Sequence, residues 1–213
     1  RGPDPDGAGR EILGRPDRAS RAVGGRTALS VQGVRPGVFL YDRGQNMVGV
    51  PKILLKGKAG QEITLRYCEI TYPKLPEYGE LCGLPLMENL RDASCTDRYI
   101  CAGDGKGELF MPRFTFHGYR YVEITGTDTP PAAGEVRGVV LSSVTRETGA
   151  FSCSDDLVNR FFENVQWSQR ANFISIPTDC PQRNERMGWM GDAQVFAQTA
   201  LYNADVRTLY YRY

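Results

Sequence analysis

Hydrophobic and polar residues alternate along much of the first two thirds of the chain, and this alternation predicts β-strands. The segment 61–70 shows it most clearly, because Ile63, Leu65 and Tyr67 fall on one face of a strand and polar residues fall between them. Other segments carry β-branched and aromatic residues at strand density, with turn signals between them. This pattern predicts an antiparallel β-sandwich. The further strand segments are 37–42, 47–57, 114–126 and 135–145, and a Pro- and Gly-rich loop is expected at 73–94.

The period of the pattern changes near residue 150. In the segment 152–173, Leu157, Phe161, Val165 and Ser168 recur at helical spacing, which predicts a helix with these residues on one stripe. Ser152 or Ser154 is expected to cap the start of this helix.

A second helical pattern follows in residues 193–213, where Val195, Thr199, Tyr202 and Leu209 form the expected inner face. This segment carries so many apolar side chains that other parts of the protein must pack against the helix on more than one side. Two helices cannot supply that cover, so we expect an α-helical domain whose larger part lies beyond residue 213. The sequence thus predicts a β-sandwich domain at 26–148 and a truncated helical domain at 149–213.

Composition narrows the classes of protein that remain. The chain has 213 residues, of which 41% are hydrophobic and 24% charged, and this is typical of a globular protein. A formal net charge of +1 gives no global field for nucleic acid or an anionic membrane, and neither is expected as a partner. Residues 1–25 are rich in Gly, Pro, Arg and Asp, lack the apolar core of a signal peptide, and are expected to form a flexible tail.

Cysteine and histidine usage argues against a metal site. The six cysteines form no C-x-x-C pair, and His117 is the single histidine, so neither a zinc site nor a histidine-based triad is expected. We therefore predict free, buried thiols and no cofactor. His117 lies in a strand segment and is expected to pack against an aromatic ring or to bind backbone.

The most unusual stretch is TDCPQRNERMGWMGD, residues 178–192, here called the acidic segment. It places Asp179, Glu185 and Asp192 six and seven residues apart, with Trp189 among them. Carboxylates that accept hydrogen bonds from vicinal hydroxyls, beside an indole that covers an apolar ring face, are what a sugar requires. Cleavage of a glycosidic bond further needs one protonated carboxyl, and Glu185, in the middle of the run, feels both like charges.

Each of these residues also has a simpler structural role. Asp192 precedes a helix and could cap it, and Asp179 lies where an Asx-turn is common. Glu185 lies between two arginines and could form a structural ion pair, while Trp189 could belong to the core. The arginines, Arg183 and Arg186, are expected to orient the carboxylates rather than to react.

The motif TDCPQRNERMGWMGDAQVFAQTALYNADV resembles the catalytic-domain signature of the α-L-rhamnosidases of glycoside hydrolase family 78. The stretches YDRGQNMVGVPKILLKGKAGQEITLRYCEI and PRFTFHGYRYVEITG resemble segments of the β-domain that precedes it. The resemblance covers about residues 35–213. It implies a β-sandwich followed by the first helices of an (α/α)6 barrel. The implied activity is hydrolysis, with inversion, of terminal non-reducing α-L-rhamnose from glycosides or polysaccharides.

By motif position, the resemblance makes Glu185 the general acid, Asp179 and Asp192 the carboxylates that hold the sugar hydroxyls, and Trp189 a wall of the pocket. Arg183 matches a position near the sugar. The family's general base is a later glutamate that no residue of this chain matches. The sequence departs from the pattern at one position, because Asn184 stands where the family usually has Asp, which removes a negative charge beside Glu185.

Two alternatives to a rhamnosidase remain at this level. The chain could be a carbohydrate-binding module without catalysis, since the β-rich region could bind glycans and the partner base is missing. It could also be an inactive fragment that aggregates or folds only in its β part, because a barrel cut after two helices leaves apolar faces open.

Overall fold

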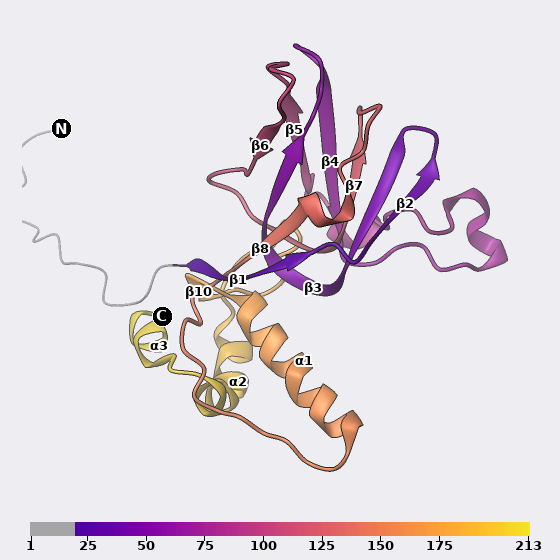
Figure 1. The fold of residues 1–213 in the computed structure, drawn as a ribbon. Coiled ribbons are helices and arrows are strands. Elements are labelled where there is room, and N and C mark those ends of the chain that lie inside the picture. The colour runs from indigo at the N-terminus through magenta and orange to yellow at the C-terminus, as the bar shows by residue number, and fades with distance from the viewer. Residues whose placement is uncertain (1–19) are drawn as a thin grey trace, which may run out of the picture.

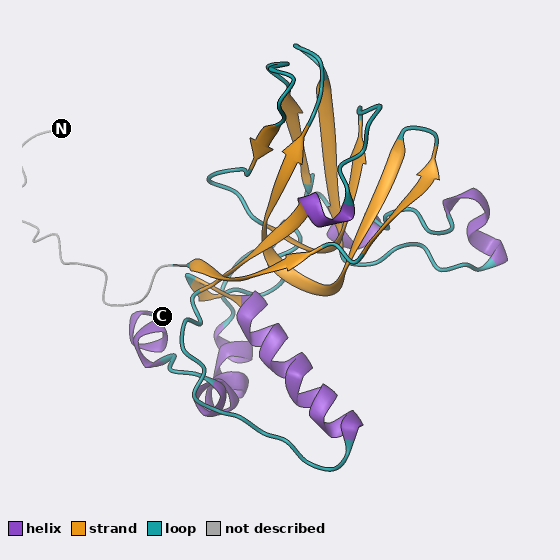
Figure 2. Ribbon diagram, in the orientation of Figure 1, coloured by secondary structure: helices purple, strands orange, loops and turns teal. Residues whose placement is uncertain are grey.

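The computed structural model describes residues 20–213 and consists mostly of antiparallel β-sheet, followed by a small group of helices (Figures 1 and 2). The strands form one eight-stranded sheet with the order β1-β8-β3-β7-β4-β5, and β2 and β6 also pair with β3. The antiparallel pairing and the change to helices are confirmed; the sandwich and the barrel remain predictions. The strands are β1 (Arg21–Thr27), β2 (Ser30–Arg35), β3 (Val38–Leu55), β4 (Glu62–Cys68), β5 (Thr96–Ile100), β6 (Glu108–Phe110), β7 (His117–Thr125) and β8 (Val136–Ser142).

Strand β3 organises the sheet, because its 18 residues pair with four other strands. Its register with β7 shifts between Asp42 and Met47, so the chain bulges there. At the bulge Gly44 has a φ of 71°, and its amide donates to Asp42 Oδ1 at 2.7 Å. The stretch Asp42–Asn46 therefore forms a bulge within a strand rather than a loop between strands.

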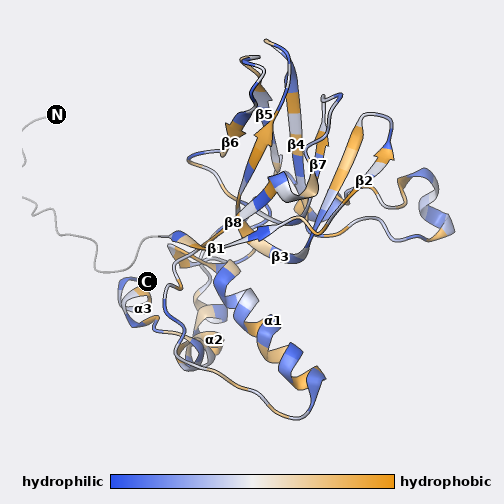
Figure 3. Ribbon diagram, viewed as in Figure 1, coloured by the Kyte–Doolittle hydropathy of each residue, from blue (hydrophilic) through white to orange (hydrophobic). Residues whose placement is uncertain are grey.

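The core of the sheet follows the alternation in the sequence. Ile63, Leu65 and Tyr67 of β4 are fully buried, as predicted, and hydrophobic residues recur along the neighbouring strands (Figure 3). The pleat sends alternate side chains to opposite faces, so one face of each strand packs inward. His117 stacks on the ring of Tyr67 with 4.1 Å between centroids, which confirms its packing on an aromatic. Its Nε2 lies 3.1 Å from the Asp97 carboxylate instead of binding backbone.

The helices lie together at one end of the sheet (Figure 1), and α1 packs against β3 and β8. Three short 3-10 helices lie between strands of the sheet, and two short strands lie between α1 and α2. The helices are α1 (Asp156–Asn172), α2 (Met190–Asn203) and α3 (Arg207–Arg212); the minor elements are η1 (Pro76–Leu81), η2 (Glu88–Leu90), η3 (Ala133–Glu135), β9 (Phe173–Ile174) and β10 (Ile176–Pro177). Among the described residues, no helix combines the length and the apolarity that a membrane crossing requires.

The apolar stripe of α1 is largely open to solvent, and most of the predicted inner face of α2 is exposed. Leu157 and Phe161 of α1 are 78% and 68% exposed, and Val195 of α2 is 86% exposed. The contact between α1 and α2 is polar instead, because Asn203 Nδ2 donates to Gln169 Oε1 at 2.9 Å. Periodicity identifies the apolar stripe of a helix but not the neighbour that covers it. Thr199 and Tyr202 of the predicted α2 face are also exposed, whereas Leu209 is buried as predicted.

The cap of α1 also differs from the prediction. Asp155 is the capping residue, and its Oδ1 accepts from the amides of Leu157 at 2.8 Å and Val158 at 3.3 Å. A carboxylate at this position satisfies two free amides and also suits the positive end of the helix.

Replacing Asp155 by alanine is therefore expected to destabilise α1 by about 1 kcal/mol, the usual loss of a side-chain cap. Ser154→Ala is the matched control, because Ser154 was the sequence-based candidate and should change the free energy of unfolding by less than about 0.5 kcal/mol. Urea unfolding followed by circular dichroism measures both. If Ser154→Ala lowered the free energy of unfolding more than Asp155→Ala, Ser154 and not Asp155 would be the capping residue.

Two further predictions have mixed outcomes. Residues 1–19 of the predicted flexible tail lie outside the described residues, whereas Arg21–Thr27 form β1 and pair with β8. The backbone hydrogen bonds along β8 thus outweigh the Gly-rich composition of residues 21–25. All six cysteines are free, but only three are buried. The buried ones are Cys68, Cys95 and Cys101; Cys82 and Cys180 are half-buried and Cys153 is exposed.

Candidate active site

The acidic segment forms a closed loop between β10 and α2. Its ends are joined by a bridge between Thr178 and Gly188, and the Asp179 amide donates to the Met187 carbonyl at 2.8 Å. Cys180 has a left-handed backbone with a φ of 48°, a conformation that costs free energy in a residue with a side chain. The loop therefore has a defined shape, and it is not a simple polar connector.

Three of the predicted site residues border one hollow of about 220 Å³, here called the first hollow. Asp179 comes from the start of the loop, Trp189 from its end and Asp192 from the first turn of α2, and helix α1 contributes further lining residues. Two of the three carboxylates of the acidic segment, Asp179 and Asp192, thus share this hollow with the indole, whereas Glu185 does not line it. The remaining lining residues are Ser168, Gln169, Asn172, Phe173, Pro177, Thr178, Ala193 and Phe196.

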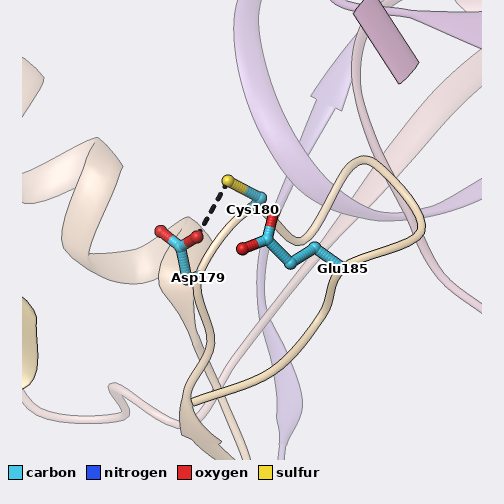
Figure 4. A group of neighbouring side chains, drawn as sticks. All are labelled: Asp179, Cys180 and Glu185. Carbon is cyan, nitrogen blue, oxygen red and sulfur yellow. Dashed lines mark hydrogen bonds between the residues drawn. The ribbon is translucent and has the colours of Figure 1, made fainter. Parts of the chain in front are cut away.

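The structure does not show the simpler roles considered for these residues, namely a helix cap for Asp192, a core position for Trp189 and an Asx-turn for Asp179. The N-cap position of α2 is Trp189, without a side-chain cap, and Asp192 lies in the first turn, so Asp192 is not the cap. Trp189 is 47% exposed and hence not a core residue. The Asp179 carboxylate accepts from the Cys180 thiol, Sγ to Oδ2 at 3.0 Å (Figure 4). These side chains are available to a ligand in the hollow.

Glu185 lies beside this group but does not border the first hollow. Its carboxylate points toward that of Asp179 (Figure 4), and oxygens of both lie within 4.8 Å of the Cys180 sulfur and of each other. Glu185 Oε2 accepts from Arg183 Nε at 3.1 Å and Nη2 at 2.8 Å, and from Arg91 Nη1 at 3.3 Å. The structural ion pair weighed for Glu185 is thus present, with Arg183 and Arg91 as its partners.

The group formed by Asp179, Cys180 and Glu185 has the compactness of a cation site, yet its chemistry is poor for one. Burial, together with the hydrogen bond to Asp179, raises the pKa of the Cys180 thiol to about 11, so the sulfur keeps its proton at neutral pH. One oxygen of Glu185, Oε2, is already paired with the Arg183 guanidinium. The thiol acts here as a hydrogen-bond donor that fixes the orientation of Asp179.

Residues from the part of the chain that forms the sheet, β1 to β8 and their connections (here called the strand part), hold the acidic segment in place. Arg91 binds Glu185, and Asn184 Nδ2 donates to Asp92 Oδ2 at 3.1 Å. Cys95 Sγ donates to the carbonyl of Gln182 at 3.1 Å. The shape of the loop therefore depends on residues that precede it by about 90 positions, since Arg91 and Glu185 are 94 residues apart.

Backbone packing adds to this bracing. A Cβ atom on Gly118 of β7 would come within 2.9 Å of the Gln182 Cα, so only glycine lets the strand approach the loop this closely. Arg186 donates to the Phe116 carbonyl at 2.8 Å and lies over the Phe116 ring. Of the two arginines expected to orient carboxylates, Arg183 does so and Arg186 instead anchors the loop to the sheet.

Sequence reasoning did not find Arg91. It lies in the Pro- and Gly-rich stretch at 73–94, which was expected to be a plain loop, and its left-handed backbone with a φ of 55° leaves no periodic signal. Its ion pair with Glu185 could be identified only from the three-dimensional structure.

Comparisons with known proteins match both parts of the chain. A family model described as the bacterial alpha-L-rhamnosidase concanavalin-like domain matches residues 32–142. A second model, described as the bacterial alpha-L-rhamnosidase 6 hairpin glycosidase domain, matches residues 146–213. An alpha-L-rhamnosidase from Formosa agariphila is 46% identical over 169 residues, which are 78% of this chain and 17% of that protein.

Solved structures agree with these matches. The alpha-L-rhamnosidase from Dictyoglumus thermophilum has a TM-score of 0.84 and 39% identity, covering 91% of this chain and 21% of that one. The alpha-L-rhamnosidase from Streptomyces avermitilis, complexed with L-rhamnose, has a TM-score of 0.84 and 38% identity, covering 93% and 18%. The chain spans 17–19% of the length of the curated relatives it matches.

Proposed function

Because this chain belongs to the bacterial α-L-rhamnosidase family, we propose that the whole protein hydrolyses terminal, non-reducing α-L-rhamnose residues of glycosides or polysaccharides, with inversion. The observation that carries the proposal is the first hollow, where Asp179, Asp192 and Trp189 meet beside Glu185. Rhamnose has vicinal hydroxyls and a methyl group, and carboxylates with an indole suit both. The relative complexed with L-rhamnose supports the same substrate class.

In this proposal Asp179 and Asp192 hold the sugar hydroxyls, Trp189 covers an apolar part of the ring and Arg183 lies near the sugar. Glu185 is the general acid that gives a proton to the leaving oxygen. An ion pair is made by an ionised carboxylate, whereas a general acid carries a proton. The acid role therefore requires that Glu185 separates from both Arg183 and Arg91 when substrate binds.

Inversion requires a second carboxyl, about 6.5–9.5 Å from the acid, that activates water on the opposite face of the sugar. We assign this base to a part of the whole protein other than residues 1–213.

We further propose that residues 26–148 form a β-sandwich domain and that residues 149–213 begin an (α/α)6 barrel. The exposed apolar side chains of Leu157 and Phe161 on α1 and of Val195 on α2 support the second proposal, because a water-facing helix surface is usually polar. Further helices of the barrel would cover them. The match of residues 146–213 to a hairpin glycosidase domain agrees with this reading.

The direct test is hydrolysis of an aryl α-L-rhamnoside by the full-length protein, followed by proton NMR. We expect the β-anomer of L-rhamnose to appear first and the α-anomer to grow in later, because single displacement inverts the anomeric carbon. An aryl β-D-glucoside is the matched control and should not be cleaved at a comparable rate. First release of the α-anomer would contradict inversion, and no release of rhamnose would contradict the proposed function.

A further inference from the structure

A second cavity, here called the polar hollow, lies against the first one and has a volume of about 390 Å³. Residues with side-chain amides line it from three directions: Gln45 and Asn46 at the bulge of β3, Asn164 and Asn172 on α1, and Gln182 in the acidic segment. Gln45, Asn46 and Asn172 each use one amide N–H within the protein and keep a second N–H and the carbonyl oxygen. An amide offers both donors and an acceptor, so a wall of amides suits a ligand rich in hydroxyl groups. The volume lies in the range of about 300–1,000 Å³ that is typical of small-ligand sites.

The charges at the polar hollow are of one sign. Glu69 and Asp179 border it, and none of the described residues that line it is Lys or Arg. Glu69 is held in place, because Asn46 Nδ2 donates to its Oε1 at 2.7 Å and Asn89 Nδ2 to its Oε2 at 3.5 Å. A neutral polyol can donate hydroxyl protons to these carboxylates, whereas a second carboxylate would be repelled.

The two hollows meet close to the proposed acid. Ser168, Asn172 and Asp179 border both of them, so they are adjacent. Cys180 borders the polar hollow, and its sulfur lies within 4.8 Å of a Glu185 carboxylate oxygen. Glu185 itself lines neither hollow, but its carboxylate lies within 4.8 Å of that of Asp179, which lines both. A proton donor so placed is near the point where an oxygen that links two sugars, one in each hollow, would be cleaved.

We propose that the polar hollow binds the sugar to which the rhamnose is attached, and that it selects a neutral sugar over a uronic acid. This inference rests on the proposed function, because it takes the first hollow as the rhamnose site. The amides hold the hydroxyls of the leaving sugar, and Glu69 with Asp179 disfavours an anionic one.

The first experiment compares the full-length protein with the double variant Gln45→Ala, Asn164→Ala on two substrates, a rhamnosyl-glucose disaccharide and a nitrophenyl α-L-rhamnoside. The nitrophenyl group has no hydroxyls for the amides. We expect kcat/KM for the disaccharide to fall about tenfold, as for the loss of two neutral hydrogen bonds, and that for the nitrophenyl substrate to stay within about twofold. Equal losses on both substrates, or no loss on either, would overturn the proposal.

The second experiment tests charge with rhamnosyl-glucose and rhamnosyl-glucuronic acid that share the same linkage. The wild-type protein should prefer the neutral disaccharide by about tenfold, and Glu69→Gln, which keeps the size of the side chain, should narrow that preference several-fold. Equal rates on the two disaccharides, or an unchanged preference in the variant, count against the proposal.

The nitrophenyl rhamnoside distinguishes an error in the proposed function from an error in the role of the polar hollow. If the wild-type protein cleaves no rhamnoside, the proposed function is wrong and the polar hollow has no leaving sugar to bind. If it cleaves the nitrophenyl rhamnoside but the variants behave as the wild type, only the assignment of the polar hollow is wrong.

Discussion

Replacing Glu185 by glutamine in the full-length protein is expected to lower kcat by about 10²- to 10⁴-fold for rhamnosides with a poor leaving group, the usual contribution of a general acid. Glutamine keeps the shape of the side chain and its contact with the loop but has no proton to give. An aryl rhamnoside with a strongly acidic leaving group needs little protonation, so its kcat should fall far less. Steady-state kinetics on both substrates measures the contrast.

The matched control for this prediction is Glu163→Gln on the exposed surface of α1. Glu163 pairs with Arg160 one helical turn away, at 3.2 Å, and such a surface pair contributes less than about 1 kcal/mol to stability. We expect its kinetics to match the wild type. If Glu185→Gln lowered kcat equally for good and poor leaving groups, Glu185 would be a sugar-binding anion held by Arg183 and Arg91, and the acid would have to be sought elsewhere.

The second large effect is expected at Asp179. Its carboxylate borders both hollows and is oriented by the Cys180 thiol, so Asp179→Asn removes a charge from the centre of the site. A hydrogen bond to a charged group contributes about 1.5–3 kcal/mol, which corresponds to a fall in kcat/KM of about 10- to 100-fold for any rhamnoside. Isothermal calorimetry with L-rhamnose should show the matching loss of affinity.

Asp205→Asn is the control for Asp179, because Asp205 pairs with Arg207 at 3.0 Å beside helix α3 and borders neither hollow. It should leave both kinetics and rhamnose binding within about twofold of the wild type. Unaltered rhamnose affinity in Asp179→Asn would remove Asp179 from the sugar site, whatever its effect on turnover.

The strand pattern was the most predictable part of this fold. The alternation at Ile63, Leu65 and Tyr67 specifies a buried face because side chains of a strand point to opposite faces by turns. Helical periodicity was less informative: Leu157 and Phe161 form the stripe that the sequence shows, yet they face solvent in the described part of the chain. Which face of a helix is covered depends on its neighbours, and local sequence does not contain them.

The same division applies to the candidate site. Asp179, Trp189 and Asp192 lie within fifteen residues, so their convergence could be inferred from the acidic segment alone. The contact between Arg91 and Glu185 could not, because it joins positions 94 residues apart through a loop without periodic signal. The polar hollow likewise combines β3, α1 and the acidic segment, which no local pattern connects.

The bracing of the acidic segment by the strand part bears on how such proteins can be recombined. Arg91, Cys95 and Gly118 come from the strand part, and each contacts the segment that carries the proposed acid. A chimaera joined near residue 148 from two distant relatives would pair one parent's scaffold with the other's reactive loop. Such hybrids would be active only where both parents carry compatible residues at the contacts between the strand part and the acidic segment. The two parts are therefore expected to be inherited together.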